Sequence, residues 1–169
     1  MILQPLRLKG VKFGKGARIG PGYDFFGICQ TNIVIGDGVT IGRRAWMQTL
    51  KSSTGMIEIG SKTSIGRDSV ISSAERISIG SECVLSYRVS IIDHDHQFSL
   101  GFGPSKTVVD NCSPVIIGNR TFIGANTTIL KGVAIGDDCV IGANSVVTTN
   151  IPNGSIAAGN PARVVKNRF

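Results

Sequence analysis

The sequence predicts an all-β protein, a parallel β-helix of about six coils with about 18 residues each. An apolar residue followed by glycine recurs every six residues along most of the 169-residue chain. The fourth residue after each of these apolar positions is small or β-branched. One large and one small inward position per hexad suit a three-sided tube, in which each side is a short strand and each corner is a turn.

Three consecutive hexads make one coil of the predicted tube. The coils begin at Phe13, Ile35, Ile59, Ile79, Ile117 and Ile135. We expect one domain, in which residues 1–12 form an N-terminal cap, residues 13–152 the coils and residues 153–169 a C-terminal cap. A helix is disfavoured, because a glycine at every sixth position costs about 1 kcal/mol each in a helix.

The small inward position confirms the register of the hexads. It is occupied by Val39, Ala45, Thr63, Ser69, Val89, Thr121, Thr127, Val133 and Ser145. Cys29, Cys83 and Cys139 fall at the same position, so we expect them to fill the core as small apolar side chains. Cys112 lies outside the register, and no C-x-x-C spacing indicates a redox pair or a zinc site.

Composition and charge exclude several classes of protein. The net charge is +7, and both ends of the chain, residues 1–20 and 160–169, carry basic residues and no acidic one. These ends suit an anionic partner, peripheral membrane association or simple solvation. The motifs of nucleic-acid-binding proteins are absent, as are an apolar run of about 18 residues and a signal-peptide core. We therefore expect a cytoplasmic protein with no membrane span and no nucleic-acid partner.

The largest interruption of the repeat is the predicted loop 97–116. The segment Asp93-His94-Asp95-His96 stands directly before it and holds the only two histidines of the chain. Histidine is the side chain best suited to accept a proton near neutral pH, and long loops in repeat proteins are commonly functional. A solvated polar turn is the plain alternative. A zinc site would need three or four ligands, so we expect no metal.

At this point the sequence resembles a known family. The hexads, the Asp-His-Asp-His segment and the closing Asn160-Pro161-Ala162-Arg163 resemble the hexapeptide-repeat acyltransferases. The chain is most similar to the maltose/galactoside acetyltransferase-like O-acetyltransferases of bacterial surface polysaccharide synthesis. The resemblance implies a left-handed β-helix, a homotrimer, acetyl-CoA as donor and direct attack by a sugar hydroxyl. An amino-sugar or xenobiotic acetyltransferase and a non-catalytic assembly module remain the alternatives.

The resemblance also implies a histidine as general base. Counting from the inward residue Ile91 favours His96, with His94 as the alternative and the second histidine orienting the substrate or the base. Asp93 or Asp95 would then fix the tautomer of the imidazole ring.

The donor and acceptor sites are carried over in the same way. The residues that match the family's acetyl-CoA site are Phe122, Gly124, Ala125, Ala143, Thr148, Arg163 and Lys166. The small residues among them would also fit the coil without any cofactor, and the basic pair would also suit a solvated tail. Aromatic candidates for the acceptor site are Tyr87, Phe98 and Phe102, with Trp46 as a further ring near the histidines.

Overall fold

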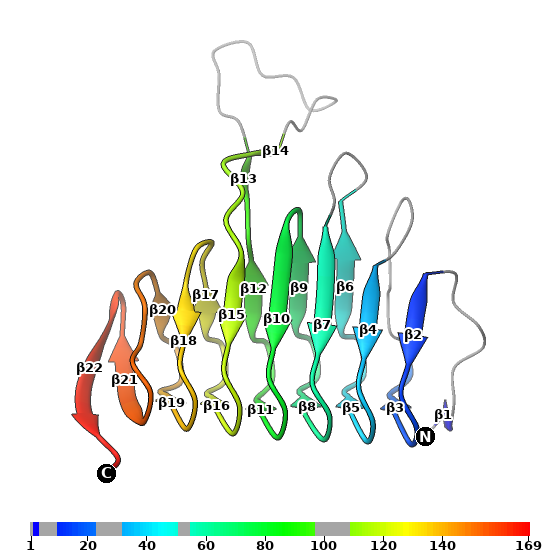
Figure 1. Cartoon of the computed structure of the whole chain (residues 1–169), viewed down its shortest axis with the longest axis horizontal. Coiled ribbons are helices and arrows are strands. Elements are labelled where there is room, and N and C mark those ends of the chain that lie inside the picture. Colours follow the sequence, from blue (N-terminus) through cyan, green and yellow to red (C-terminus); the bar gives the residue numbers. More distant parts are fainter. Residues whose placement is uncertain (1, 4–9, 23–31, 51–54, 97–108) are drawn as a thin grey trace.

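The chain winds into a parallel β-solenoid whose coils follow one another along a single axis (Figure 1). The computed structural model describes residues 2–3, 10–22, 32–50, 55–96 and 109–169, and these residues contain strands and turns but no helix. The expected all-β repeat architecture is confirmed. Across these ranges no helix is long and apolar enough to span a bilayer.

Three sheets form the sides of the solenoid. Side 1 contains β2 (Val11–Phe13), β4 (Ile33–Ile35), β7 (Met56–Ile59), β10 (Arg76–Ile79), β15 (Val115–Ile117) and β18 (Ala134–Ile135). Side 2 contains β1 (Ile2–Leu3), β3 (Arg18–Ile19), β5 (Thr40–Ile41), β8 (Ser64–Ile65), β11 (Val84–Leu85), β16 (Phe122–Ile123), β19 (Val140–Ile141), β21 (Ser155–Gly159) and β22 (Ala162–Asn167). Side 3 contains β6 (Trp46–Thr49), β9 (Val70–Ser73), β12 (Ser90–Ile92), β17 (Thr128–Ile129) and β20 (Val146–Val147).

The register between coils is the one that the hexads predict. On side 2, for example, Ile41 pairs with Ile65, Ile65 with Leu85, and Leu85 with Ile123. Inward residues of successive coils therefore stack in columns, and these columns form the hydrophobic core. The small inward positions, with Cys83 and Cys139, are buried as expected. One coil cannot bury such a column alone, so the stability of the fold belongs to the stack.

The number of coils differs slightly from the expected six. All three strands are described for five coils, the first of which begins with β4. The earlier coil contributes β2 and β3, while its third side at Phe25 and the nearby Cys29 lie outside the described residues. The handedness of the coils stays a prediction from the family resemblance.

Both ends of the solenoid carry antiparallel strands. β1 pairs antiparallel with β3 at the N-terminal end, and β22 pairs antiparallel with β21 at the C-terminal end. Antiparallel pairing at the last coil covers a strand edge that would otherwise be open to a further chain.

The corner between side 3 and side 1 departs from the regular repeat. After β12 the chain leaves the solenoid, forms β13 (Asp95–His96) and returns through β14 (Val109–Asp110), which pairs antiparallel with β13. The chain re-enters side 1 at β15, and the β13–β14 pair projects from the row of coils (Figure 1). The Asp-His-Asp-His segment therefore stands at the edge of side 3, where the solenoid is interrupted.

Candidate functional site

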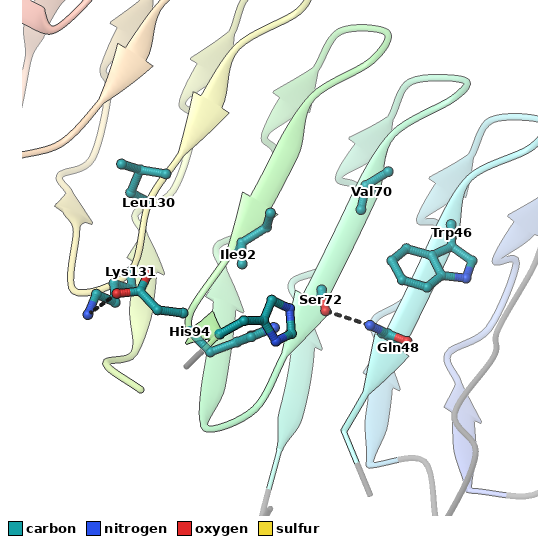
Figure 2. A pocket seen from close by; sticks show the side chains of 10 residues that line it. Trp46, Gln48, Val70, Ser72, Ile92, His94, Leu130 and Lys131 are labelled. Atoms are coloured by element: carbon teal, nitrogen blue, oxygen red, sulfur yellow. Dashed lines mark hydrogen bonds and ion pairs between the residues drawn. The ribbon is translucent and has the colours of Figure 1, made fainter. Parts of the chain in front are cut away.

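A cavity of about 570 Å³ lies on the outward face of side 3 and reaches the histidine segment (Figure 2). Its lining residues are Trp46, Gln48, Val70, Ser72, Ile92, His94, Asp95, His96, Leu130 and Lys131. The cavity extends across β6, β9 and β12 to Leu130 and Lys131, which directly follow β17.

The strand register explains this lining. Side chains alternate between the two faces of a strand, so the neighbours of each buried residue point outward. Met47 is buried, and its neighbours Trp46 and Gln48 line the cavity. Ile71 is likewise buried between Val70 and Ser72. The parallel pairing of β6 with β9 places these outward residues side by side.

Asp93 is fully buried at the corner that follows β12. Its Oδ1 accepts a hydrogen bond from the backbone N–H of Ala74 at 2.6 Å, and its Oδ2 accepts from the Ser73 hydroxyl at 2.7 Å and from the N–H of Glu75 at 2.9 Å. The carboxylate therefore caps the tight turn of the preceding coil. Burial of a carboxylate is tolerated only when hydrogen bonds replace water in this way.

The fourth partner of the Asp93 carboxylate is His94. Its Nδ1 lies 3.0 Å from Asp93 Oδ1, and both side chains are almost completely buried. Burial alone would raise the pKa of Asp93, but the hydrogen bonds from His94, Ala74, Ser73 and Glu75 outweigh it and hold the pKa below its ordinary value. An ionised carboxylate only accepts, so the His94 Nδ1 carries the proton, and Nε2 is left as the nitrogen that can accept one.

His96 and Asp95 differ from this pair in burial and in partners. Both are exposed at the start of the projecting β13–β14 pair. The rings of His94 and His96 meet edge to face with centroids 5.2 Å apart, so the two histidines lie together as expected. Asp95 instead forms an ion pair with Lys131, whose Nζ lies 2.7 Å from Asp95 Oδ2 (Figure 2).

The aromatic residues expected near the acceptor are only partly brought to this cavity. Trp46 lines it, at the end away from Lys131 (Figure 2). Tyr87 lies at the other end of β12, at the corner between sides 2 and 3, where Arg67 and Arg88 lie over its ring. It does not line the cavity, so the structure does not join Tyr87 to the histidines. Phe98 and Phe102 lie outside the described residues.

The residues expected to bind the cofactor lie on the last coils, in separate places. Phe122 is exposed on side 2, and Gly124, Ala125 and Ala143 follow at the corner between sides 2 and 3. Arg163 and Lys166 are exposed on β22.

Thr148 and Gly124 complete the set of expected acetyl-CoA residues. Thr148 is exposed just after β20. A Cβ at Gly124 would lie only 2.8 Å from Ala143 Cα, so this glycine is needed for packing against the next coil.

Sequence reasoning missed six cavity residues: Gln48, Val70, Ser72, Ile92, Leu130 and Lys131. The signal was present, because Gln48, Ser72 and Leu130 each directly follow an inward hexad residue, as Ile92 does. Following the outward positions of side 3 from the histidine segment to the neighbouring coils would have identified these three residues. Lys131 follows Leu130 and could be placed only by its contact with Asp95.

The site places a buried, oriented histidine at the wall of a largely apolar cavity. An oriented histidine beside such a space suits proton removal from a bound hydroxyl or amine. Among the residues that the structure describes, no cluster of three or more His, Cys, Asp or Glu could hold a metal ion.

Comparisons with known proteins connect this geometry to a family. The model described as "Hexapeptide repeat of succinyl-transferase" matches residues 114–149. The probable acetyltransferase Rv3034c of Mycobacterium tuberculosis is 40% identical over 134 residues, which are 79% of this chain and 44% of the relative. The putative colanic acid biosynthesis acetyltransferase WcaF of Escherichia coli is 30% identical over 163 residues, which are 96% of this chain and 72% of the relative.

A maltose O-acetyltransferase of Clostridium difficile has a similar structure, with a TM-score of 0.61 and 26% identity over 94% of this chain and 70% of the other. The chain spans about half the length of the first curated relatives it matches. The match to the colanic acid protein nevertheless covers most of both chains, and the five fully described coils keep the hexapeptide register. The chain therefore belongs to the hexapeptide-repeat acetyltransferase family.

Proposed function

We propose that this protein transfers an acetyl group from acetyl-CoA to a hydroxyl of a sugar or polysaccharide precursor, with His94 as the general base. The observation that carries the proposal is the buried Asp93–His94 pair at the wall of the cavity. The relatives named as acetyltransferases support the reaction class, and the family resemblance supports acetyl-CoA as the donor.

The reaction is a direct transfer. Nε2 of His94 takes the proton of the acceptor hydroxyl while the hydroxyl oxygen attacks the thioester carbonyl carbon. The tetrahedral intermediate then collapses, the carbon–sulfur bond breaks, and the protonated His94 returns the proton to the leaving thiolate of CoA. The products are the acetyl ester and free CoA, and the base is restored. Asp93 keeps the proton of His94 on Nδ1 and stabilises the transient imidazolium.

The choice of His94 reverses the preference for His96 that residue counting gave. His96 is exposed, whereas His94 is buried and has its Nδ1 fixed by a carboxylate. A base with one tautomer and one orientation needs little reorganisation before proton transfer. His96 then covers the edge of the His94 ring and contacts the substrate from the exposed side of the cavity.

The donor approaches from the C-terminal coils. At the corner between sides 2 and 3, the coils that begin with β15 and β18 carry the small residues Ala125 and Ala143, whereas earlier coils carry Arg67 and Tyr87 at the same position. Small corner residues leave the backbone accessible to an extended pantetheine chain. Arg163 and Lys166 on β22 supply the positive charge that the CoA phosphates require.

The assignment of the base is tested by His94→Gln and His96→Gln, assayed by thiol release from acetyl-CoA in the presence of saccharide acceptors. Glutamine keeps approximate size and polarity but does not act as a base. We expect His94→Gln to lower kcat by about 10²–10⁴-fold, the typical contribution of a placed base. We expect His96→Gln to change kcat by less than about tenfold and to alter the KM for the acceptor.

Two controls make the result specific. Acetyl-CoA binding measured by calorimetry should be little changed in both variants, since the proposed contacts of the pantetheine chain and the phosphates lie on the C-terminal coils, and only the thioester end reaches the histidines. Hydroxylamine should release the acetyl group from the product, because it cleaves esters and leaves amides intact. A larger kcat loss in His96→Gln would return the base to His96, and a hydroxylamine-resistant product would identify an amino-sugar acceptor.

A further inference from the structure

The end of the cavity away from Lys131 is formed by Trp46 and Gln48 on β6 (Figure 2). Trp46 is the only tryptophan of the chain, and its side chain is partly buried on the outward face of side 3. The indole presents an aromatic surface to the cavity beside Val70 of the next coil. An exposed aromatic surface within a cavity is a common site for contact with the apolar face of a ligand.

Polar groups accompany this aromatic surface. Gln48 Nε2 donates a hydrogen bond to Ser72 Oγ at 2.8 Å, across the pairing of β6 with β9 (Figure 2). The bond orients Gln48, whose carbonyl oxygen is an acceptor and whose second Nε2 hydrogen is a donor for a further partner, while Ser72 itself is only 4% exposed and holds Gln48 in place. An aromatic face beside an oriented acceptor and donor matches a pyranose ring, which has apolar C–H faces and hydroxyl groups at its edge.

The distance between Trp46 and His94 indicates which unit of the acceptor a sugar ring on Trp46 would be. β6 lies two coils from β12, the strand that leads to His94, and each step between paired strands is about 4.8 Å. Trp46 is therefore about 10 Å from the reacting end along the solenoid axis. A sugar ring stacked on Trp46 cannot also present its hydroxyl to His94, so it must be a neighbouring unit of the same acceptor.

We propose that Trp46, Gln48 and Ser72 form a distal acceptor subsite for a pyranose ring, and that the acceptor is accordingly a glycan of at least two sugar units. This inference rests on the proposed function for the identity of the reacting end. The donor reaches His94 from the C-terminal coils, and the glycan reaches it from the N-terminal coils. The two substrates therefore meet at the histidine without competing for the same part of the cavity.

The position of Trp46 gives a direct test. In the His94→Gln protein, which is not expected to turn over, indole fluorescence reports only on Trp46. The probes are methyl glycosides of glucose, galactose and N-acetylglucosamine, and the matching 1,4-linked disaccharides. We expect at least one disaccharide to change the fluorescence saturably and to bind about tenfold more tightly than its monosaccharide.

Variants of the subsite provide the second measurement. By calorimetry, Trp46→Ala should abolish the preference for the disaccharide, Gln48→Ala should reduce it, and Trp46→Phe should retain most of it. Phe169→Ala removes an exposed aromatic ring at the C-terminus and serves as the matched control that leaves sugar binding unchanged.

The outcomes separate this inference from the proposed function. Equal binding of monosaccharides and disaccharides, or saturable binding without any fluorescence change, would overturn the distal subsite while leaving acetyl transfer intact. Tight disaccharide binding that depends on Trp46, in a wild-type protein that acetylates none of the probes, would support the subsite and count against the proposed reaction. If no probe binds although another hydroxyl compound is acetylated, the glycan assignment is wrong.

Discussion

Asp93 connects the fold to the chemistry at the level of single residues. Its carboxylate closes the corner of the preceding coil through Ala74 and Glu75, and the same carboxylate holds Nδ1 of His94. One buried charge therefore performs two tasks, which cannot be separated by removing the side chain. A substitution that keeps its shape and removes its charge is the informative one.

We expect Asp93→Asn to lower kcat by about 10²–10⁴-fold, because an amide can hold the His94 ring in the tautomer that has no free Nε2 acceptor. We also expect a loss of about 2–3 kcal/mol in the free energy of unfolding at neutral pH, since hydrogen bonds to a charged acceptor are lost. Thiol release and urea denaturation measure the two effects. Unchanged kcat would show that Asp93 only supports the corner.

The pH dependence of this stability difference follows from the lowered pKa of Asp93. A carboxyl group whose pKa is lower in the folded state stabilises the protein above its ordinary pKa, here 3.8, and loses that contribution as the pH falls through the lowered value. The difference in the free energy of unfolding between the wild type and Asp93→Asn should therefore be largest at pH 7 and decrease below about pH 4. A gap that persists at pH 2 would show that the charge of Asp93 is not its cause.

The sequence singled out the histidine segment, which lines the cavity, but it did not show how the residues of that segment differ in burial. The position of the two histidines before the longest interruption identified the segment. Which histidine is buried depends on Ala74 and Glu75, which lie about 20 residues earlier and meet Asp93 only when the coils stack. Residue counting contains no information on such contacts. Tyr87 does not line the cavity for a related reason, because closeness in sequence to His94 does not account for the length of β12 that separates the two residues.

At the level of elements, close packing between successive coils at the corners requires glycine, and these glycines produce the repeat in the sequence. Successive coils are so close at each corner that a Cβ at Gly118 would lie 2.6 Å from the nitrogen of Asp137, and one at Gly124 would lie 2.8 Å from Ala143 Cα. These two glycines are thus explained by the neighbouring coil. This is why the hexads predicted strands, corners and core columns correctly, whereas residues 97–116 were predicted only as a loop, within which the structure places β14 and the start of β15.

The same contacts predict the behaviour of Gly124→Ala and Gly118→Ala. Both variants force a backbone shift in the next coil and should lose about 1–3 kcal/mol, with Tm falling by about 2–4 °C per kcal/mol. Gly118 lies at the corner between sides 1 and 2 and serves as the control for packing. If Gly124 also supports the acetyl-CoA site, only Gly124→Ala should weaken acetyl-CoA binding by calorimetry. Equal affinities in the two variants would limit Gly124 to a packing role.

At the level of the whole molecule, side 2 presents an outward stripe of apolar residues near the C-terminal coils. Val84 is 45% exposed and Phe122 is 42% exposed, and the stripe continues through Val140 and Ile156, which pair in sequence from coil to coil. An apolar stripe of this kind on an outer face indicates a surface for association. The family resemblance implies a homotrimer, and we expect this stripe to be buried between its subunits.

The prediction is tested by adding a charge at one of two neighbouring positions. Val84 pairs with Ser64 on the adjacent strand, so the two side chains are neighbours on the outward face of side 2. Val84 belongs to the apolar stripe, whereas Ser64 lies just outside it. Light scattering should give three times 17.8 kDa for the wild type and for Ser64→Glu, and a single chain mass for Val84→Glu. A buried carboxylate without a partner costs several kcal/mol, which is enough to dissociate an interface of moderate affinity.

A wild type that is monomeric, or a Val84→Glu protein that stays trimeric, would show that side 2 does not form the interface. Circular dichroism of both variants establishes that the coils are folded, so that any change in mass reports on association alone.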